Sequence, residues 1–234
     1  MSTAENTTDP SVHRPGRPED LPAAPVLWAR WGLLAGLLST REREAEREIH
    51  RAGYWMASGR DDTLRFYDGG ASWWALRRAG DGRYVLYGED ESSEVKWQEE
   101  AIDVLGGAPD WLPLELLRDL VESYMIGCVY WYEDGAWARA PYPAGLADDG
   151  LDCGMSRLFT TGRAADEVEP WMDHETADPD AEVDPEAAAR LLTDAVSGSV
   201  GEEAVRAFLV DAGLAEEEIP GALVTLRRTG LLAE

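Results

Sequence analysis

Carboxylates near predicted turns are the residues of this sequence whose type could perform acid–base chemistry. Two carboxylates that face each other across a cleft can act as general acid and base, or as a nucleophile. Because the chain contains 46 Asp and Glu residues, acidic residues at turns are also expected without any catalytic role. We therefore assign no catalytic residue and keep a hydrolase with paired carboxylates, or with an acidic metal site, as an alternative. The candidate carboxylates are Asp68, Glu89, Asp90, Glu91, Glu133 and Asp134.

The sequence predicts no metal site and no cofactor. The histidines are His13, His50 and His174, and none has a second histidine at the spacing of a metal-binding pair. The acidic run Asp178–Glu186 alternates carboxylates as a calcium loop does, but its sixth position is Val183, where an EF-hand needs glycine. We interpret this run as a solvated acidic linker.

Aromatic residues in predicted strands form a second candidate set. Trp73 and Trp74 are adjacent, so in a strand they point to opposite faces. Tyr130, Tyr132 and Trp137 repeat the pattern on a later hairpin. One face would build the core, and the other could present aromatic side chains as a protein-binding hot spot, or as a surface that stacks on a sugar or base. The alternative is that covering helices bury both faces.

Turn signals divide the middle of the chain into antiparallel strands. Asp68-Gly69-Gly70 and Ala79-Gly80-Asp81-Gly82 separate runs rich in aromatic and β-branched residues, and an Asp-Gly turn at 134–135 joins two further runs. Between these groups, residues 91–97 are predicted as a polar loop or an edge strand. The predicted strands are Tyr54–Ala57, Thr63–Tyr67, Ser72–Arg78, Arg83–Gly88, Gly127–Tyr132 and Ala136–Ala140.

Alternation along the last hairpin predicts which of its side chains share a face. Val129 and Trp131 point to one side of the strand, and Tyr130 and Tyr132 point to the other. The helix predicted at 111–125 precedes this hairpin and has an apolar face that must be covered. We expect Trp131 to pack in the core and the two tyrosines to lie on the exposed, functional side.

Apolar periodicity predicts an α+β fold in which helices cover an antiparallel sheet of five or six strands. Helices are expected at 26–51 and 111–125, and a small C-terminal three-helix bundle follows at 185–197, 201–213 and 216–229. The predicted organisation is a disordered arm at 1–24, a sheet domain at 25–160, an acidic linker at 161–184 and the helical bundle at 185–234.

The charge of the chain narrows the class of partner. Its formal net charge is −25, of which residues 61–145 contribute −10 and residues 146–234 contribute −15. A surface this acidic repels nucleic-acid phosphates and anionic lipids, and attracts basic proteins. The sequence also lacks an apolar run of the roughly 18–20 residues that span a bilayer. We therefore expect a cytoplasmic protein that binds neither nucleic acid nor membrane.

These observations favour a non-enzymatic, acidic protein-binding module for a basic partner, such as an inhibitor or an immunity protein. The hydrolase described above remains one alternative, and a small-ligand binder that uses exposed aromatics is another. The predicted binding residues are Trp73, Trp74, Tyr130, Tyr132, Trp137, Glu89, Asp90, Glu91, Glu133 and Asp134.

Overall fold

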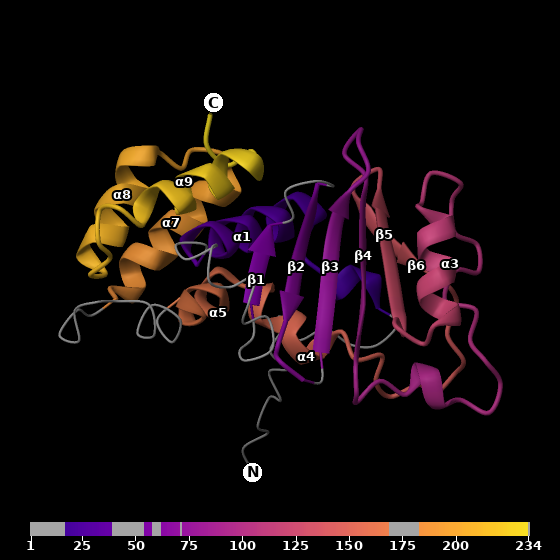
Figure 1. The fold of residues 1–234 in the computed structure, drawn as a ribbon. Coiled ribbons are helices and arrows are strands. Elements are labelled where there is room, and N and C mark those ends of the chain that lie inside the picture. Colours follow the sequence, from indigo (N-terminus) through magenta and orange to yellow (C-terminus); the bar gives the residue numbers. More distant parts are fainter. Residues whose placement is uncertain (1–16, 39–53, 58–61, 71, 169–182, 234) are drawn as a thin grey trace, which may run out of the picture.

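A six-stranded antiparallel sheet forms the centre of the computed structural model, which describes residues 17–38, 54–57, 62–70, 72–168 and 183–233 (Figure 1). Each strand pairs with the next strand in sequence, in the order β1 to β6. The predicted α+β class is confirmed. The strands are β1 (Tyr54–Ala57), β2 (Thr63–Tyr67), β3 (Ser72–Arg78), β4 (Tyr84–Asp90), β5 (Cys128–Glu133) and β6 (Ala136–Arg139).

Short polar turns set the register of the sheet. Between β2 and β3, the Asp68 carboxylate accepts hydrogen bonds from the amides of Gly70 and Ser72, both at 2.9 Å. Between β5 and β6, Asp134 and Gly135 have φ values of 52° and 84°. Two consecutive residues with positive φ make the tight turn whose twist matches a hairpin.

Ten helical segments surround the sheet in the part of the chain that the structure describes. Predicted helix boundaries differ from the observed ones by a few residues, and the predicted continuation of the first helix to residue 51 lies outside the described residues. The helices are η1 (Pro18–Asp20), α1 (Ala24–Leu37), η2 (Val95–Trp97), α3 (Leu114–Glu122), α4 (Asp152–Met155), η3 (Ser156–Leu158), α5 (Thr161–Asp166), α7 (Pro185–Ser197), α8 (Glu202–Asp211) and α9 (Ile219–Arg228).

Helix α1 lies between the sheet and the C-terminal helices, because it contacts β1 and β2 as well as α7 and α9 (Figure 1). Glycine allows α9 to approach α1 closely. A Cβ added at Gly36 would lie 2.3 Å from Leu226 Cδ2 of α9, which is far inside van der Waals contact. The indole of Trp28 in α1 also donates a hydrogen bond to the Thr229 carbonyl at 3.0 Å.

The face of the sheet toward α1 forms the larger core. Trp74 of β3 and Tyr130 of β5 are fully buried in it, together with Leu192 of α7 and Leu226 of α9. Residues of the sheet and of the C-terminal helices therefore share one continuous core. The division of the chain into a sheet domain and a helical bundle stays a prediction.

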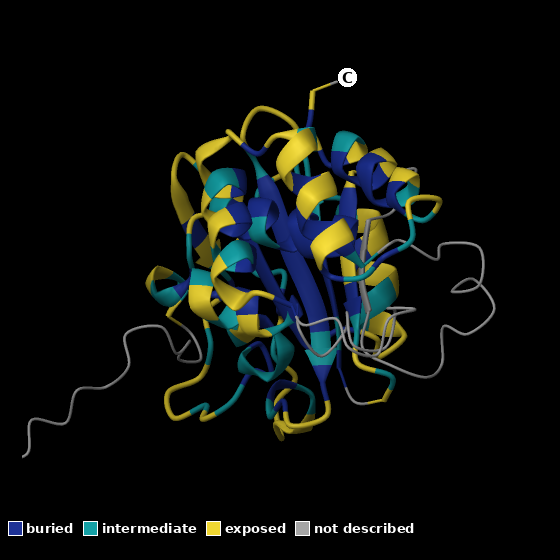
Figure 2. Ribbon diagram, turned by 90° about the vertical axis from the view of Figure 1, so that its left-hand side faces the viewer, coloured by how far each residue is buried: buried dark blue, intermediate teal, exposed yellow. Residues whose placement is uncertain are grey.

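The opposite face of the sheet forms a second core with α3 and the segments that flank it. Val129 and Trp131 of β5 are buried there with Leu117 of α3, so the predicted orientation of Trp131 is confirmed. Figure 2 shows the strands as buried ribbons enclosed by helices whose outer surfaces are exposed. The central strands are consequently covered on both faces.

Two of the segments that were predicted without regular structure contain a helix. The predicted disordered arm at 1–24 includes η1 and the buried Leu21, while residues 1–16 lie outside the described residues. The predicted linker at 161–184 begins with helix α5, which starts because the Thr160 hydroxyl accepts a hydrogen bond from the Arg163 amide. Within the described residues, no helix combines the length and apolar character needed to cross a bilayer.

Candidate functional site

Most of the predicted binding aromatics lie in the core, so the prediction of an exposed aromatic face on the hairpin is wrong. Trp74, Tyr130, Tyr132 and Trp137 are all buried on the side that α1 and the C-terminal helices cover. The indoles of both tryptophans also donate hydrogen bonds inside the protein. The indole of Trp74 donates to the Cys153 carbonyl at 2.9 Å, and that of Trp137 donates to the Pro22 carbonyl at 2.8 Å.

The predicted carboxylates lie at opposite ends of the sheet. In the antiparallel pair β4–β5, Gly88 lies opposite Cys128 and Tyr84 lies opposite Tyr132. The end of β4 and the turn between β5 and β6 are therefore separated by roughly the length of a strand, about 20 Å for seven residues. The acids do not converge on one cleft. Asp68, Glu89, Asp90 and Glu91 lie at one end, and Glu133 and Asp134 lie at the other.

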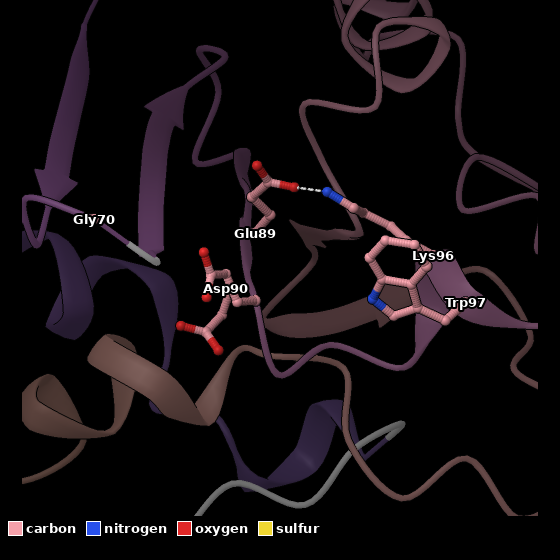
Figure 3. A pocket seen from close by; sticks show the side chains of 6 residues that line it. Gly70, Glu89, Asp90, Lys96 and Trp97 are labelled. Atoms are coloured by element: carbon pink, nitrogen blue, oxygen red, sulfur yellow. Dashed lines mark hydrogen bonds and ion pairs between the residues drawn. The ribbon is translucent and has the colours of Figure 1, made fainter.

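A surface pocket of about 360 Å³ lies at the end of β4, where three of the predicted acids are. Figure 3 shows Glu89 pointing toward Lys96, with Gly70 and Trp97 on opposite sides of the carboxylates. The glycine comes from the turn between β2 and β3, and the lysine and tryptophan come from η2. The lining residues are Gly70, Glu89, Asp90, Glu91, Lys96 and Trp97.

Three of the charged side chains in this pocket, Lys96, Glu89 and Asp90, have fixed partners. Lys96 forms an ion pair with Glu89 and donates a second hydrogen bond to the Tyr124 carbonyl at 3.0 Å. Lys96 is also the only lysine in the sequence. Asp90 accepts hydrogen bonds from the Ser72 hydroxyl and from the Ser92 amide, the latter at 2.8 Å. The pocket therefore combines one internally neutralised carboxylate with two further acids.

Asp90 remains ionised despite its position. Partial burial by itself raises the pKa of this carboxyl, but the hydrogen bonds from Ser72 and Ser92 outweigh burial and hold the pKa below its ordinary value. A general acid for hydrolysis needs the opposite, a pKa raised toward the working pH. Asp90 therefore fits a permanent negative charge better than a proton donor.

Two exposed aromatics outside the predicted binding set adjoin Lys96, one through the chain and one through its carbonyl. Trp97 follows Lys96 in η2 and is 77% exposed, and Tyr124, whose carbonyl accepts from Lys96, is 76% exposed. Met125 is 46% exposed, and its carbonyl accepts a hydrogen bond at 3.0 Å from the half-buried Trp73. Large exposed apolar side chains near one another mark interaction sites more often than scattered ones do. Trp73 is the only predicted aromatic that borders this surface.

Tyr124 occupies a backbone conformation that normally belongs to glycine. It follows the C-terminus of α3 with φ = 55°. Its amide donates to the Val121 carbonyl at 3.0 Å, and the Met125 amide donates to the Leu120 carbonyl at 2.9 Å. These two bonds define the helix-terminating motif in which glycine is usual at the left-handed position. A bulky residue there is strained, and such strain concentrates at functional sites.

A second polar cluster is buried under the sheet. The Tyr130 hydroxyl donates to the fully buried Asp149 at 2.6 Å, and the Cys128 thiol lies 3.8 Å from the same carboxylate. Burial and the nearby Asp149 charge raise the pKa of Cys128 well above its ordinary value, so the thiol stays protonated. A buried, protonated thiol is not a nucleophile, and these bonds fasten the segment around Asp149 to the sheet.

Most of the residues that the predictions about metals and histidines concern lie outside the described residues. All three histidines and most of the acidic run Asp178–Glu186 lie outside them. Within the ranges that the structure does describe, no group of three or more His, Cys, Asp or Glu side chains is arranged to hold a metal ion.

Comparison with known proteins adds no relative, since no family model, curated protein or solved structure matches this chain. The candidate site therefore rests on its own geometry. It is the surface around Lys96, formed by Trp97, Tyr124 and Met125 next to Glu89, Asp90 and Glu91, which we term the sheet-end surface. A surface that combines exposed aromatic side chains with carboxylates can bind a ligand that is both apolar and cationic.

Proposed function

We propose that the protein is a non-enzymatic binding module, such as an inhibitor or immunity protein, whose sheet-end surface binds a basic partner protein. The observation that carries the proposal is the exposure of Trp97 beside the carboxylates of the pocket, with the exposed Tyr124 bonded to Lys96 through its carbonyl. Tryptophan and tyrosine are the residues most enriched in binding hot spots, where they anchor a partner while charges around them set specificity.

Charge complementarity supports a basic partner. With a net charge of −25, the chain attracts cationic proteins over long range and repels nucleic acid and anionic lipid. Among the described residues of the sheet-end surface, Lys96 is the one cation, and it is paired with Glu89. A cytoplasmic location is part of this proposal.

The strain at Tyr124 provides further support. A left-handed conformation costs a non-glycine residue about 1–2 kcal/mol, and glycine would remove most of that cost. A tyrosine that is strained and exposed contributes little to the fold. Partner binding gives a reason for its presence.

The proposal is tested with the full-length protein as bait in lysate of its source cells. Trp97→Ala should weaken capture of a basic protein by about 2 kcal/mol or more, roughly 30-fold, because the aromatic anchor is lost. Capture by the parent protein should also fall steeply between low salt and several tenths molar salt, as screening shortens the reach of the charges. Quantitative mass spectrometry identifies the captured protein and its charge.

Val210→Ala is the matched control, because Val210 is an exposed apolar residue of α8, outside the sheet-end surface. It should capture the same protein as the parent. The proposal fails if the Trp97 and Val210 variants capture equally, or if the protein that depends on Trp97 is not basic.

A further inference from the structure

We propose that the pocket at the end of β4 receives an arginine side chain of the partner. The inference rests on the proposed function and specifies it, because it names the group that the pocket recognises. The pocket combines an anionic wall, an exposed tryptophan and an open rim, and each of these features selects for a guanidinium group.

The anionic wall retains uncompensated negative charge. Lys96 pairs with Glu89, which leaves Asp90 and Glu91 as the pocket carboxylates without an ion-pair partner among the described residues. The Ser72 hydroxyl and the Ser92 amide donate hydrogen bonds to Asp90 but do not neutralise it. A cationic side chain that enters the pocket would therefore meet two negative charges.

The tryptophan distinguishes arginine from lysine. Trp97 lines the pocket and is 77% exposed, so a face of its indole is open to a ligand. A planar guanidinium stacks on an aromatic ring and bonds carboxylates in a fork, whereas an ammonium is a compact, strongly hydrated point charge. Arginine can use the tryptophan and the acids at the same time.

The size of the pocket suits a side chain rather than a larger ligand. Its volume of about 360 Å³ is near the lower end of the range for small-molecule sites. Gly70 forms part of the rim, and apart from Gly70 and its two chain neighbours no heavy atom of the described residues lies within 4 Å of a Cβ added there. Gly70 is also absent from the glycines with positive φ, so a larger residue fits without backbone strain.

Gly70→Leu therefore places a side chain at the pocket while leaving the carboxylates and Trp97 unchanged. Gly162→Leu is the matched control, because a Cβ at Gly162 likewise meets no described atom within 4 Å and the residue lies in α5, away from the pocket. Both variants add the same apolar side chain to the surface. Only the first obstructs the proposed arginine site.

The experiment compares two capped peptides of equal charge, tri-arginine and tri-lysine, by isothermal titration calorimetry with the full-length protein. The parent and Gly162→Leu should bind the arginine peptide about threefold to tenfold more tightly than the lysine peptide. Gly70→Leu and Trp97→Ala should bind both peptides with equal, weak affinity. Since Lys96 is the only lysine, reductive methylation with ¹³C-formaldehyde gives one side-chain NMR signal that should shift with the arginine peptide.

Equal affinity of the parent for the two peptides, or a preference that survives Gly70→Leu, would overturn the arginine pocket. These results are separable from the test of the proposed function. Loss of the basic partner in Trp97→Ala without any arginine preference refutes only the pocket. An arginine preference in a protein whose captured partners do not depend on Trp97 refutes the proposed function.

Discussion

The aromatics of the β5–β6 hairpin and those of the connection between β4 and β5 have opposite environments. Tyr130, Tyr132 and Trp137 are buried in the hairpin, whereas Trp97 and Tyr124 in the connection are more than three-quarters exposed. Helices cover both faces of the sheet, so an aromatic residue in a central strand is part of a core whichever way it points. Among the described residues, the large exposed aromatics lie where connections cross the end of the sheet.

The same comparison separates two ways of using polar groups. In the hairpin, the Tyr130 hydroxyl is directed to the buried Asp149, and burial raises the pKa of that phenol far above its ordinary value. At the sheet end, Lys96 uses its bonds to hold the Tyr124 carbonyl and Glu89 while the aromatic rings beside it stay in solvent. The first arrangement stabilises the fold, and the second positions a surface.

The largest expected effect is the loss of stability when a buried aromatic residue is replaced by alanine. Tyr130→Ala should lower the free energy of unfolding by about 3–5 kcal/mol, because it empties a fully buried site and removes a donor from Asp149. Trp131→Ala should cost a similar amount on the opposite face. Trp97→Ala should change stability by less than about 0.5 kcal/mol, because the indole is exposed. Urea denaturation of the three variants measures this difference.

If Tyr130→Ala were as stable as the parent, the continuous core between the sheet and the C-terminal helices would be wrong. A large loss of unfolding free energy in Trp97→Ala would instead show that the sheet-end surface is part of the core.

An intermediate effect of opposite sign is expected at Tyr124. Tyr124→Gly should raise the free energy of unfolding by about 1 kcal/mol, because glycine relieves the left-handed conformation at the end of α3. The same variant should weaken partner binding, because it deletes an exposed aromatic. Thermal melts and the capture assay are both required.

Asp134→Gly is a matched control, since Asp134 also has a positive φ, 52°, but lies at the other end of the sheet. It should leave capture unchanged and gain less stability, because aspartate tolerates the left-handed region better than tyrosine does. A Tyr124→Gly protein that is more stable and still binds fully would contradict a functional reason for the strain.

The smallest effect concerns the charge of Asp90. Its pKa is lowered in the folded protein from an ordinary value of 3.8, so the ionised carboxylate stabilises the fold above that pH. This contribution is lost as the pH falls through the lower, folded-state pKa. Asp90→Asn keeps the shape and one acceptor oxygen, which can serve the Ser92 amide, but removes the charge and the second acceptor oxygen. Its stability should therefore fall less steeply below about pH 4.

Urea denaturation of the parent and Asp90→Asn between about pH 2 and pH 6 gives the two slopes. Identical slopes for the parent and Asp90→Asn would show that the Ser72 and Ser92 bonds do not favour the ionised form.

The sequence alone determined those features that depend on neighbouring residues. The Asp-Gly turn and the alternating pattern beside it predict the β5–β6 hairpin and the orientation of Trp131. The helix predicted at 185–197 matches α7, where the Asp184 carboxylate accepts from the Glu186 amide at 2.9 Å and Gly198 has φ = 72°. Each feature is set by a few consecutive residues, which is why the strands and the α+β class could be predicted.

Only the tertiary structure decided which aromatics are exposed and where the pocket lies. Trp28 bonds to the Thr229 carbonyl across 201 positions of sequence, and such distant contacts bring the C-terminal helices and α1 over the face that was expected to be open. The pocket also depends on residues that are distant in sequence, because it is lined by Gly70 from the turn before β3 and by residues of η2 after β4. Local sequence patterns do not predict these long-range contacts, because the contacts depend on the packing of the whole core.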